Sequence, residues 1–467
     1  MGQQDAAIWE TQARAGRRHR AASVAAAQPV GWLLRQRRDL LASTALGASA
    51  VLLLACPAVA QPAPGARPQG GAVVAGSASI SQTAARTNVA QTSQRAAVDW
   101  RSFDVGSGHT VAFQQPNASS VTLNRVTGPD PSQIAGRIQA NGQVVLVNGS
   151  GVVFHAGSQV DAQSLVVSAA NVTNRNFMAG RMVFDQPGKA DARISNAGTI
   201  TVGATGLAAL VAPQVANSGV INARMGRVVL AGAEAHTVDL YGDGLMSVDV
   251  TRQVTRAPNG GTALVTNTGV IQADGGTIQL TARAADGIVQ NLVSAGGRLQ
   301  ANTAGGKPGA IVVAGVGGSI TVEGAVRADG IAPGAQGGTV VLAATGTVAV
   351  GPAARVSANG RGGGGTVAVG TTLARARAQS GGVPADSARA VQVAAGARIS
   401  ADGRGTGSGG QVAVLSTDNT VVAGRLSARG GRQGGDGGQV EVSGGKGLQI
   451  TGTVDTSASR AYGDADH

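Results

Sequence analysis

The side chains that most often carry catalysis or bind metals are few in this sequence and far apart. The five histidines have no cysteine and no acidic residue at metal-site spacing; they are His19, His109, His155, His236 and His467. The sequence has no Gly-x-Ser-x-Gly motif, and no lysine is followed by the Ser or Thr of a phosphate-binding loop. It therefore predicts no catalytic site, no metal site and no cofactor.

Acidic residues do recur, but within a repeated pattern. Asp329 and Asp402 each follow a short apolar strand and precede a glycine, and Asn359 and Arg429 take the same place in other copies. A polysaccharide-cleaving enzyme built from stacked strands would need acids clustered in one groove. Since Asn and Arg replace the acid in other copies, these residues are interpreted as turn formers. Such an enzyme remains the rival functional class.

The composition indicates a folded protein made of strands. Of 467 residues, 73 are Gly, and the aromatic residues are three Trp, two Tyr and five Phe. Hydrophobic residues make up 43% and charged residues 13%, too apolar for a disordered chain, and no Gly-X-Y period is present. The core must therefore consist of Val, Ile, Leu and Ala, which suit pleated sheets.

The net charge of +12 does not predict a nucleic-acid partner. Residues 1–60 contribute +4, from seven Arg and three acids, which leaves +8 on the remainder of the chain. The remaining arginines are scattered singly and no stripe interleaves them with aromatic side chains, as nucleic-acid binding would require.

Residues 1–60 are predicted to be an extended signal region. Three arginines precede an apolar run, residues 40–55, which ends in Ala58-Val59-Ala60. This pattern predicts a secretory signal cleaved after Ala60. The first 34 residues are either part of the signal or follow a start codon placed too early. Cys56 is the only cysteine, so the exported chain has no disulfide; lipidation of Cys56 is the alternative to cleavage.

Short motifs repeat from about residue 190 onward. Asn-x-Gly followed by two apolar residues recurs, and Gly followed by alternating apolar residues recurs at Gly276, Gly338, Gly365, Gly410 and Gly438. Strands of about five residues separated by Gly, Asn and Asp turns, at periods of 20 to 50 residues, are typical of a solenoid. The sequence therefore predicts an all-β fold, a right-handed parallel β-helix.

The aromatic residues mark the predicted amino-terminal end of this solenoid. All five Phe and Trp100 fall within residues 100–184, and we interpret this segment as the cap and first coils. The predicted division is a signal region 1–60, a linker 61–72, a first domain 73–250, Gly-rich repeats 251–457 and a polar tail 458–467.

The first domain contains a series of motifs in a fixed order. They are Val98-Asp99-Trp100-Arg101-Ser102-Phe103, Val111-Ala112-Phe113-Gln114-Gln115-Pro116-Asn117, Leu123-Asn124-Arg125-Val126, Pro131-Ser132-Gln133-Ile134 and Ala140-Asn141-Gly142-Gln143-Val144-Val145-Leu146-Val147-Asn148. In this order and spacing they resemble the amino-terminal secretion domain of filamentous haemagglutinin-like exoproteins. Residues 438–457 resemble a later repeat of large adhesins of this family.

The resemblance implies two-partner secretion in a Gram-negative bacterium. The partner would be an outer-membrane barrel whose POTRA domains recognise the chain in the periplasm, and the product would be an adhesin or a surface structural protein, secreted or on the cell surface. A truncated stick of a contact-dependent toxin-delivery protein is a further alternative. The ligand of such a protein is not encoded in any motif.

The candidate transporter-recognition residues lie in the matched motifs. They are Asn117, Asn124, Asn148, Gly149, Ser150 and Gly151. A carboxamide can donate and accept hydrogen bonds, so it can mark the register of an extended chain added to a sheet edge. The same side chains could instead satisfy backbone groups at turns of the finished fold. The family has an Asn-Pro-Asn-Gly turn after this strand, whereas this chain has Asn148-Gly149-Ser150-Gly151, a softer turn.

Overall fold

A computed structural model describes residues 60–238, 248–256, 263–378 and 383–458. The chain divides into two compact units, Met1–Ala58 and Val59–His467, and the described residues belong to the second. The predicted signal region and its Ala58 lie outside the described residues, apart from the exposed Ala60. The predicted polar tail also lies outside them, apart from Ala458.

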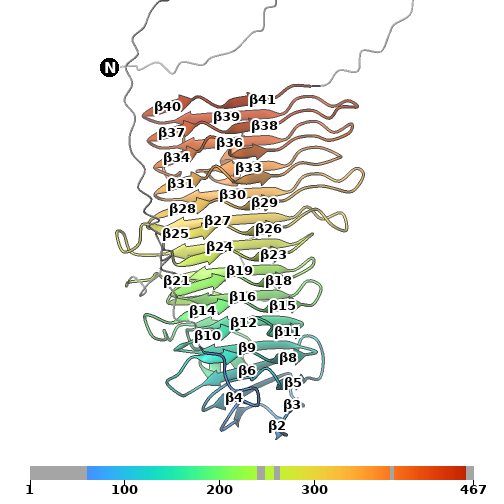
Figure 1. Cartoon of the computed structure of the whole chain (residues 1–467), viewed down its shortest axis with the longest axis vertical. Helices are drawn as coiled ribbons and strands as arrows, with labels where there is room; N and C mark the ends of the chain where they lie inside the picture. Colours follow the sequence, from blue (N-terminus) through green and yellow to red (C-terminus); the bar gives the residue numbers. More distant parts are fainter. Residues whose placement is uncertain (1–59, 239–247, 257–262, 379–382, 459–467) are drawn as a thin grey trace, which may run out of the picture. The chain divides into compact units, whose positions relative to one another are not determined.

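Three long sheets, I to III, make up the fold of the described residues (Figure 1). Sheet I has the order β1 (Ala72–Ala75), β4 (Arg95–Trp100), β6 (Val121–Val126), β9 (Gln143–Asn148), β12 (Ser164–Ser168), β16 (Leu207–Ala212), β19 (Arg227–Gly232), β24 (Thr277–Arg283), β27 (Ala310–Val316), β30 (Thr339–Ala344), β33 (Thr366–Val369), β36 (Gln411–Ser416) and β39 (Gln439–Gly444).

Sheet II has the order β2 (Ala78–Gln82), β3 (Arg86–Gln91), β5 (Thr110–Gln114), β8 (Arg137–Ala140), β11 (Gln159–Ala162), β15 (Thr199–Val202), β18 (Val220–Asn222), β23 (Val270–Gln272), β26 (Arg298–Gln300), β29 (Ala325–Arg327), β32 (Arg355–Ser357), β35 (Arg398–Ser400), β38 (Arg425–Ser427) and β41 (Thr453–Asp455). Sheet III has the order β7 (Ser132–Ile134), β10 (Gly151–Phe154), β14 (Arg193–Asn196), β17 (Gln214–Asn217), β22 (Val265–Asn267), β25 (Asn291–Ala295), β28 (Ser319–Val322), β31 (Thr347–Val350), β34 (Ala390–Val393), β37 (Asn419–Val422) and β40 (Gly447–Ile450).

From β6 onward each coil contributes one strand to each sheet. From β6 the chain passes to β7 in sheet III, β8 in sheet II and back to sheet I at β9, and each strand pairs in parallel with its counterpart in the next coil. This is the predicted parallel β-helix, which is confirmed. The three ladders continue through the predicted division at residue 250, since β19 pairs with β24 and β18 with β23.

The amino-terminal cap differs from the prediction. Two antiparallel strands close the edges of sheets I and II, β1 on β4 and β2 on β3, and both precede the aromatic segment. Residues 61–71, predicted to be a linker, pack here as well: Gln69 forms a bridge with Ser102, and a Cβ on Gly71 would lie 2.5 Å from the Trp100 ring. Trp100 thus closes the interior, as predicted, beneath a segment whose sequence gave no strand signal.

Alternating side chains fill the space between the sheets. In β29 and β32 of sheet II the middle residue, Val326 or Val356, is buried in the interior, and the residues on either side are less buried. Residues Trp100, Phe103, Phe113 and Phe154 belong to this interior core. Inward Val, Ile and Leu on successive coils give the fold a continuous apolar core.

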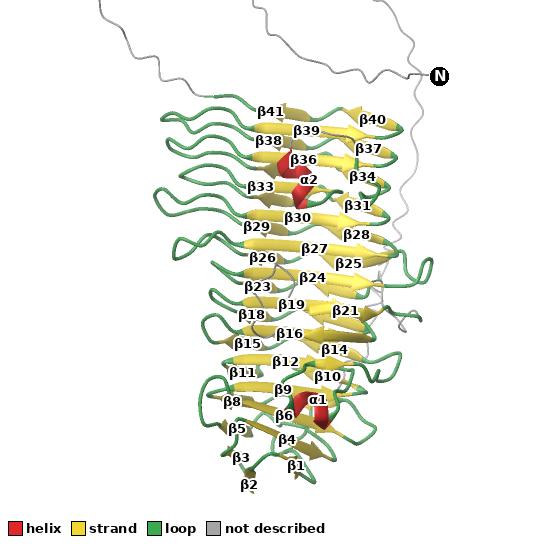
Figure 2. Cartoon of the chain, turned by 180° about the vertical axis from the view of Figure 1, so that it is seen from behind, coloured by secondary structure: helices red, strands yellow, loops and turns green. Residues whose placement is uncertain are grey.

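Sheet I is covered on its outer face as well (Figure 2). Helix α1 (Asn174–Met178) and a small antiparallel sheet of β13 (Val183–Phe184), β20 (Ala235–Val238) and β21 (Val248–Arg252) cover the amino-terminal coils, with Phe177 and Phe184 in a second apolar cluster. These two phenylalanines therefore lie on the flank and not in the predicted cap. Helix α2 (Leu373–Ala378) covers later coils, where Arg375 pairs with Glu441.

The glycines that begin the second repeat motif form a column in which successive coils touch. A Cβ on Gly365 would lie 2.0 Å from the carbonyl oxygen of Gly338, and one on Gly410 would lie 2.1 Å from that of Gly365. Real Cβ atoms do not approach an oxygen so closely, so close backbone approach requires Gly at this corner.

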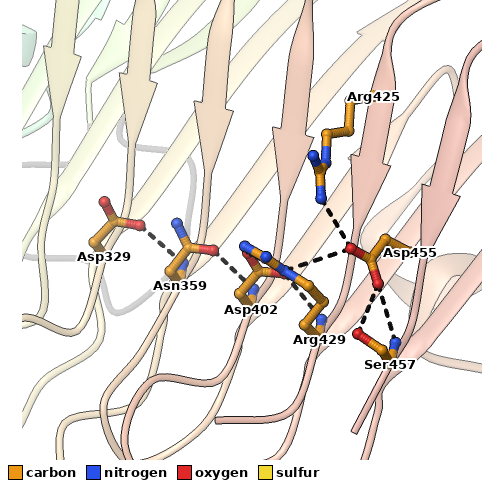
Figure 3. Close-up of polar contacts among 7 residues, drawn as sticks. All are labelled: Asp329, Asn359, Asp402, Arg425, Arg429, Asp455 and Ser457. Atoms are coloured by element: carbon orange, nitrogen blue, oxygen red, sulfur yellow. Dashed lines mark hydrogen bonds and ion pairs between the residues drawn. The ribbon is translucent and has the colours of Figure 1, made fainter. Parts of the chain in front are cut away.

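The repeated position that follows the sheet II strands, where Asp329 and Asp402 stand, forms a hydrogen-bonded column, the Asp/Asn ladder, which consists of Asp274, Asn302, Asp329, Asn359 and Asp402. Each side chain accepts the backbone N–H of its counterpart one coil later, at 2.7 to 3.0 Å, and Arg429 donates the last N–H (Figure 3). Carboxylate and carboxamide alternate, so no two carboxylates are direct neighbours. Asp329 and Asp402 therefore join successive coils by hydrogen bonds just beyond strands β29 and β35.

His236 is a buried imidazole in the flank of sheet I. It is 1% exposed and stacks on Phe184 with ring centroids 4.7 Å apart, and neither ring nitrogen has a hydrogen-bond partner in the described part of the chain. Burial lowers the pKa of His236 to about 3. The folded chain therefore holds this side chain neutral.

We expect the free energy of unfolding to fall by about 2 kcal/mol between pH 7.5 and pH 5 because of His236. In the unfolded chain the imidazole has its usual pKa of about 6.5. Below that pH the unfolded state therefore binds a proton at His236, whereas the folded state does not. The contribution of His236 to the free energy of unfolding is fully present well above pH 6.5, and it is lost progressively as the pH falls from there toward 3. Denaturant unfolding at both pH values measures it.

The matched variant is His236→Phe, which keeps a ring against Phe184 and cannot be protonated. Its loss of stability between pH 7.5 and pH 5 should be smaller than that of the parent chain by the same 2 kcal/mol or so. His155 remains in both proteins; burial lowers its pKa too, so some pH dependence persists. Equal pH dependence in parent and variant would contradict the assignment to His236.

Candidate functional site

The matched motifs form most of strands β4, β5, β6, β7 and β9 and the turns beside them. Arg125 of β6 holds several of these parts together: its guanidinium pairs with Asp99 at 2.8 Å and donates to Asn171 at 2.8 Å and to Asn174 at 2.7 Å. It thereby fastens the α1 segment to the outer face of sheet I. Arg125 is not among the candidate residues predicted from the sequence, although its outward position next to Asn124 in a strand could have suggested a surface contact.

Asn124 points into the interior of the β-helix. It pairs in register with Val98 and Leu146, is 0% exposed, and its Oδ1 accepts the indole N–H of Trp100 at 3.0 Å. A buried indole N–H needs an acceptor, and a carboxamide supplies one inside an apolar core. In the folded chain Asn124 therefore stabilises the first coils.

Asn117 occupies an exposed turn between β5 and β6. Its Oδ1 accepts the N–H of Ser119 at 3.0 Å and the Ser119 hydroxyl at 2.7 Å, and its Nδ2 donates to Gln94 at 3.1 Å. The first of these bonds is an Asx turn. Of the three candidate asparagines, it alone presents a side chain at the surface.

Asn148 ends β9 and organises the turn into β10. It is 0% exposed; its Nδ2 donates to the carbonyl of Asp130 and to the Ser132 hydroxyl, both at 3.0 Å, and its Oδ1 accepts the N–H of Ser150 at 2.9 Å. Ser150 in turn donates to the carbonyl of Pro129 at 2.5 Å. The side chain of Asn148 thus joins two successive coils.

The two glycines of this turn have different constraints. Gly151 has φ +105°, and a Cβ there would lie 2.2 Å from the carbonyl oxygen of Arg193, so this position requires Gly. A Cβ on Gly149 would lie 3.5 Å from its nearest neighbour, an ordinary contact. Lys189 is not among the residues predicted from the sequence, but it also contacts this turn: its Nζ donates to the carbonyl of Pro129 at 2.7 Å.

The candidate residues do not gather into one surface. Asn117 is exposed, whereas Asn124 and Asn148 are fully buried and face different surroundings. A receptor could therefore contact all three carboxamides only before the chain folds. Within the described ranges no group of three metal-ligating side chains occurs, and none of the helices found there has the length and apolar character needed to cross a membrane.

The fold and the motifs define an exported β-helical protein, and comparisons identify its family. A family model described as the TPS secretion domain matches residues 65–328, more than half of the chain. The chain therefore belongs to the TPS secretion domain family, that of two-partner secretion exoproteins, and is exported to the surface or surroundings of a Gram-negative cell. The match extends past the predicted boundary at residue 250.

Solved and curated relatives agree with this family. The secretion domain of HMW1 from Haemophilus influenzae superposes with a TM-score of 0.68 at 27% identity, covering 84% of this chain and 99% of that domain. A heme/hemopexin-binding protein of Haemophilus influenzae is 31% identical over 223 residues, which is 46% of this chain and 24% of that protein. The chain thus spans about a quarter of the length of this curated relative.

Proposed function

We propose that residues 61 to about 250 are the export signal of a surface adhesin or surface structural protein. In this proposal the POTRA domains of a dedicated outer-membrane barrel recognise the segment in the periplasm, and the chain folds after it has crossed the barrel. Family membership implies the outer-membrane transporter, and the recognition step rests on the placement of the asparagines.

The burial of Asn124 and Asn148 is the observation that carries this proposal. Both are 0% exposed once the β-helix has formed, so their carboxamides are accessible only on an unfolded chain. An extended segment can add to the edge of a receptor sheet by main-chain hydrogen bonds, with side chains at alternate positions setting the register. The absence of cysteine after Cys56 fits the same route, because a chain without disulfides can pass a pore unfolded.

Deletion of residues 100–160 tests the export signal in cells that carry the partner barrel. The deletion removes the matched motifs, and we expect the chain to remain in the periplasm and the medium to contain none of it. The matched control deletes one later coil, residues 411–438, which leaves the motifs intact and preserves the alignment of the sheets. Undiminished secretion of the 100–160 deletion would refute the proposal.

We expect the mature chain to begin at Gln61. The Ala58-Val59-Ala60 sequence has small residues at the positions that signal peptidase reads. Mass spectrometry of the amino-terminal peptide of the released protein measures this directly. An amino-terminal lipidated Cys56 would contradict the prediction and indicate a membrane-anchored product instead.

A further inference from the structure

A basic groove lies on the outer face of sheet II, away from the matched motifs. It has a volume of about 640 Å³, and its side chains come from β26, β29, β32 and β35 and the loops that follow them. We call it the arginine groove; five arginines line it, Arg298, Arg327, Arg355, Arg398 and Arg404, and Asp329 is its only acid. The lining therefore carries a net charge of +4, from five cations and one anion.

None of these five arginines has an ion pair in the described part of the chain. Arg355 donates to the carbonyls of Ala354 and Gly396, and Arg298 donates to Gln300. The side chains of Arg327, Arg398 and Arg404 make no hydrogen bond there, and all three are exposed. Three guanidinium groups are thus available to an outside ligand.

The nearby carboxylates of the Asp/Asn ladder make their hydrogen bonds within the ladder and to neighbouring groups, and none of them pairs with an arginine of the groove in the described part of the chain. Asp329 accepts the N–H of Asn359 at 2.8 Å on one oxygen and the Ser357 hydroxyl at 3.0 Å on the other. Asp402 accepts the N–H of Arg429 and the side chain of the same residue (Figure 3). The ladder thus holds its acids on backbone groups and leaves the neighbouring arginines unpaired.

The positions of the arginines on neighbouring strands destabilise sheet II when no ligand is bound. Arg355 pairs directly with Arg398, and Arg398 with Arg425, so three arginines project from the same register position of adjacent strands whose backbones lie about 4.8 Å apart. Like charges directly opposite in a sheet destabilise it. Of these three arginines, Arg425 alone has an acid partner among the described residues, Asp455 at 2.8 Å. An anionic ligand would relieve the repulsion at the other two.

The shape of the groove selects among anions. It crosses four successive coils, so it suits an extended molecule with several anionic groups. Guanidinium groups bind phosphate and carboxylate in a bidentate manner. The groove has no aromatic side chain on which a nucleic-acid base could stack, whereas Ile331, 59% exposed, offers an apolar contact at its rim.

We propose that the arginine groove binds the phosphorylated saccharide of lipopolysaccharide in the outer leaflet of the outer membrane. This anionic glycolipid is the surface that a chain released from a Gram-negative cell meets first, and basic pockets recognise anionic headgroups. The inference rests on the export proposed above and would keep part of the released protein on the cell.

Flotation of the secreted chain with phosphatidylcholine vesicles, with and without lipopolysaccharide, tests the proposal. The test variant carries Arg327→Gln, Arg398→Gln and Arg404→Gln. The control variant has the same net charge and carries Arg256→Gln, Arg377→Gln and Arg389→Gln, at exposed positions outside both the groove and the proposed export signal. Because the protein is purified from the medium, binding is measured separately from export.

We expect the parent chain and the control to bind vesicles that contain lipopolysaccharide, and the groove variant to bind about 100-fold more weakly. Added salt should weaken parent binding more steeply than variant binding. Equal binding by the groove variant would overturn the proposal. So would equal binding to dephosphorylated lipopolysaccharide, or to vesicles that contain phosphatidylglycerol in its place.

Discussion

Replacing Asn148 with Asp should reduce the amount of chain released into the medium at least about tenfold, with the remainder held in the periplasm. The substitution preserves size but removes the Nδ2 donor and adds a negative charge. On the unfolded chain it changes the carboxamide that the proposed receptor would contact. In the folded chain it leaves the Asp130 carbonyl and the Ser132 hydroxyl without their donor at a site that is 0% exposed. Immunoblots of medium and periplasm, in cells with the partner barrel, measure the distribution.

Asn267→Asp separates recognition from folding. Asn267 is also 0% exposed, also ends a strand, β22, and accepts a hydrogen bond from Asn217 at 2.7 Å, but it lies outside the matched motifs. We expect this variant to reach the medium as a protease-sensitive product. If Asn148→Asp and Asn267→Asp are retained in the periplasm to the same extent, lost folding energy explains the effect and the recognition role of Asn148 is wrong.

Replacing Trp100 with Ala should lower the free energy of unfolding by about 3 to 5 kcal/mol. Trp100 is 1% exposed, packs edge-on against Phe103 with ring centroids 5.6 Å apart, and lies beneath residues 69–71 of the cap. Its removal opens a cavity at the end of the interior core and leaves Asn124 without the indole N–H. Guanidinium unfolding of the purified parent and variant chains, followed by circular dichroism, measures the change independently of export.

Two further variants divide this effect into packing and hydrogen bonding. Trp100→Phe keeps most of the ring but leaves the Asn124 Oδ1 without the indole donor, at a cost of about 1 to 3 kcal/mol. Combining it with Asn124→Leu removes both partners, and part of that stability should return. A Trp100→Ala chain within 1 kcal/mol or so of the parent would show that the cap does not depend on this residue.

The fold class could be predicted from the sequence because each coil repeats the same local pattern. Val326 and Val356 stand between outward-facing neighbours, and glycines such as Gly365 stand at a corner where a Cβ would collide with the previous coil. Each coil needs only its nearest neighbours, so one repeat contains the information for the next. The candidate export segment could also be predicted from the sequence, because the motifs around Asn124 and Asn148 are contiguous in the chain.

The cap, the flank of sheet I and the arginine groove were decided by the tertiary structure. Residues 61–71 contain no strand pattern, yet they cover Trp100, and Arg125 reaches Asn171 only because sheet I brings β6 beside the α1 segment. Arg298, Arg355 and Arg398 stand at irregular intervals in the chain, because insertions of different length separate the coils. They reach the same register position only when their strands pair, because the inserted residues then lie in loops outside the sheet. Strand pairing depends on the strands themselves and only weakly on the number of residues between them.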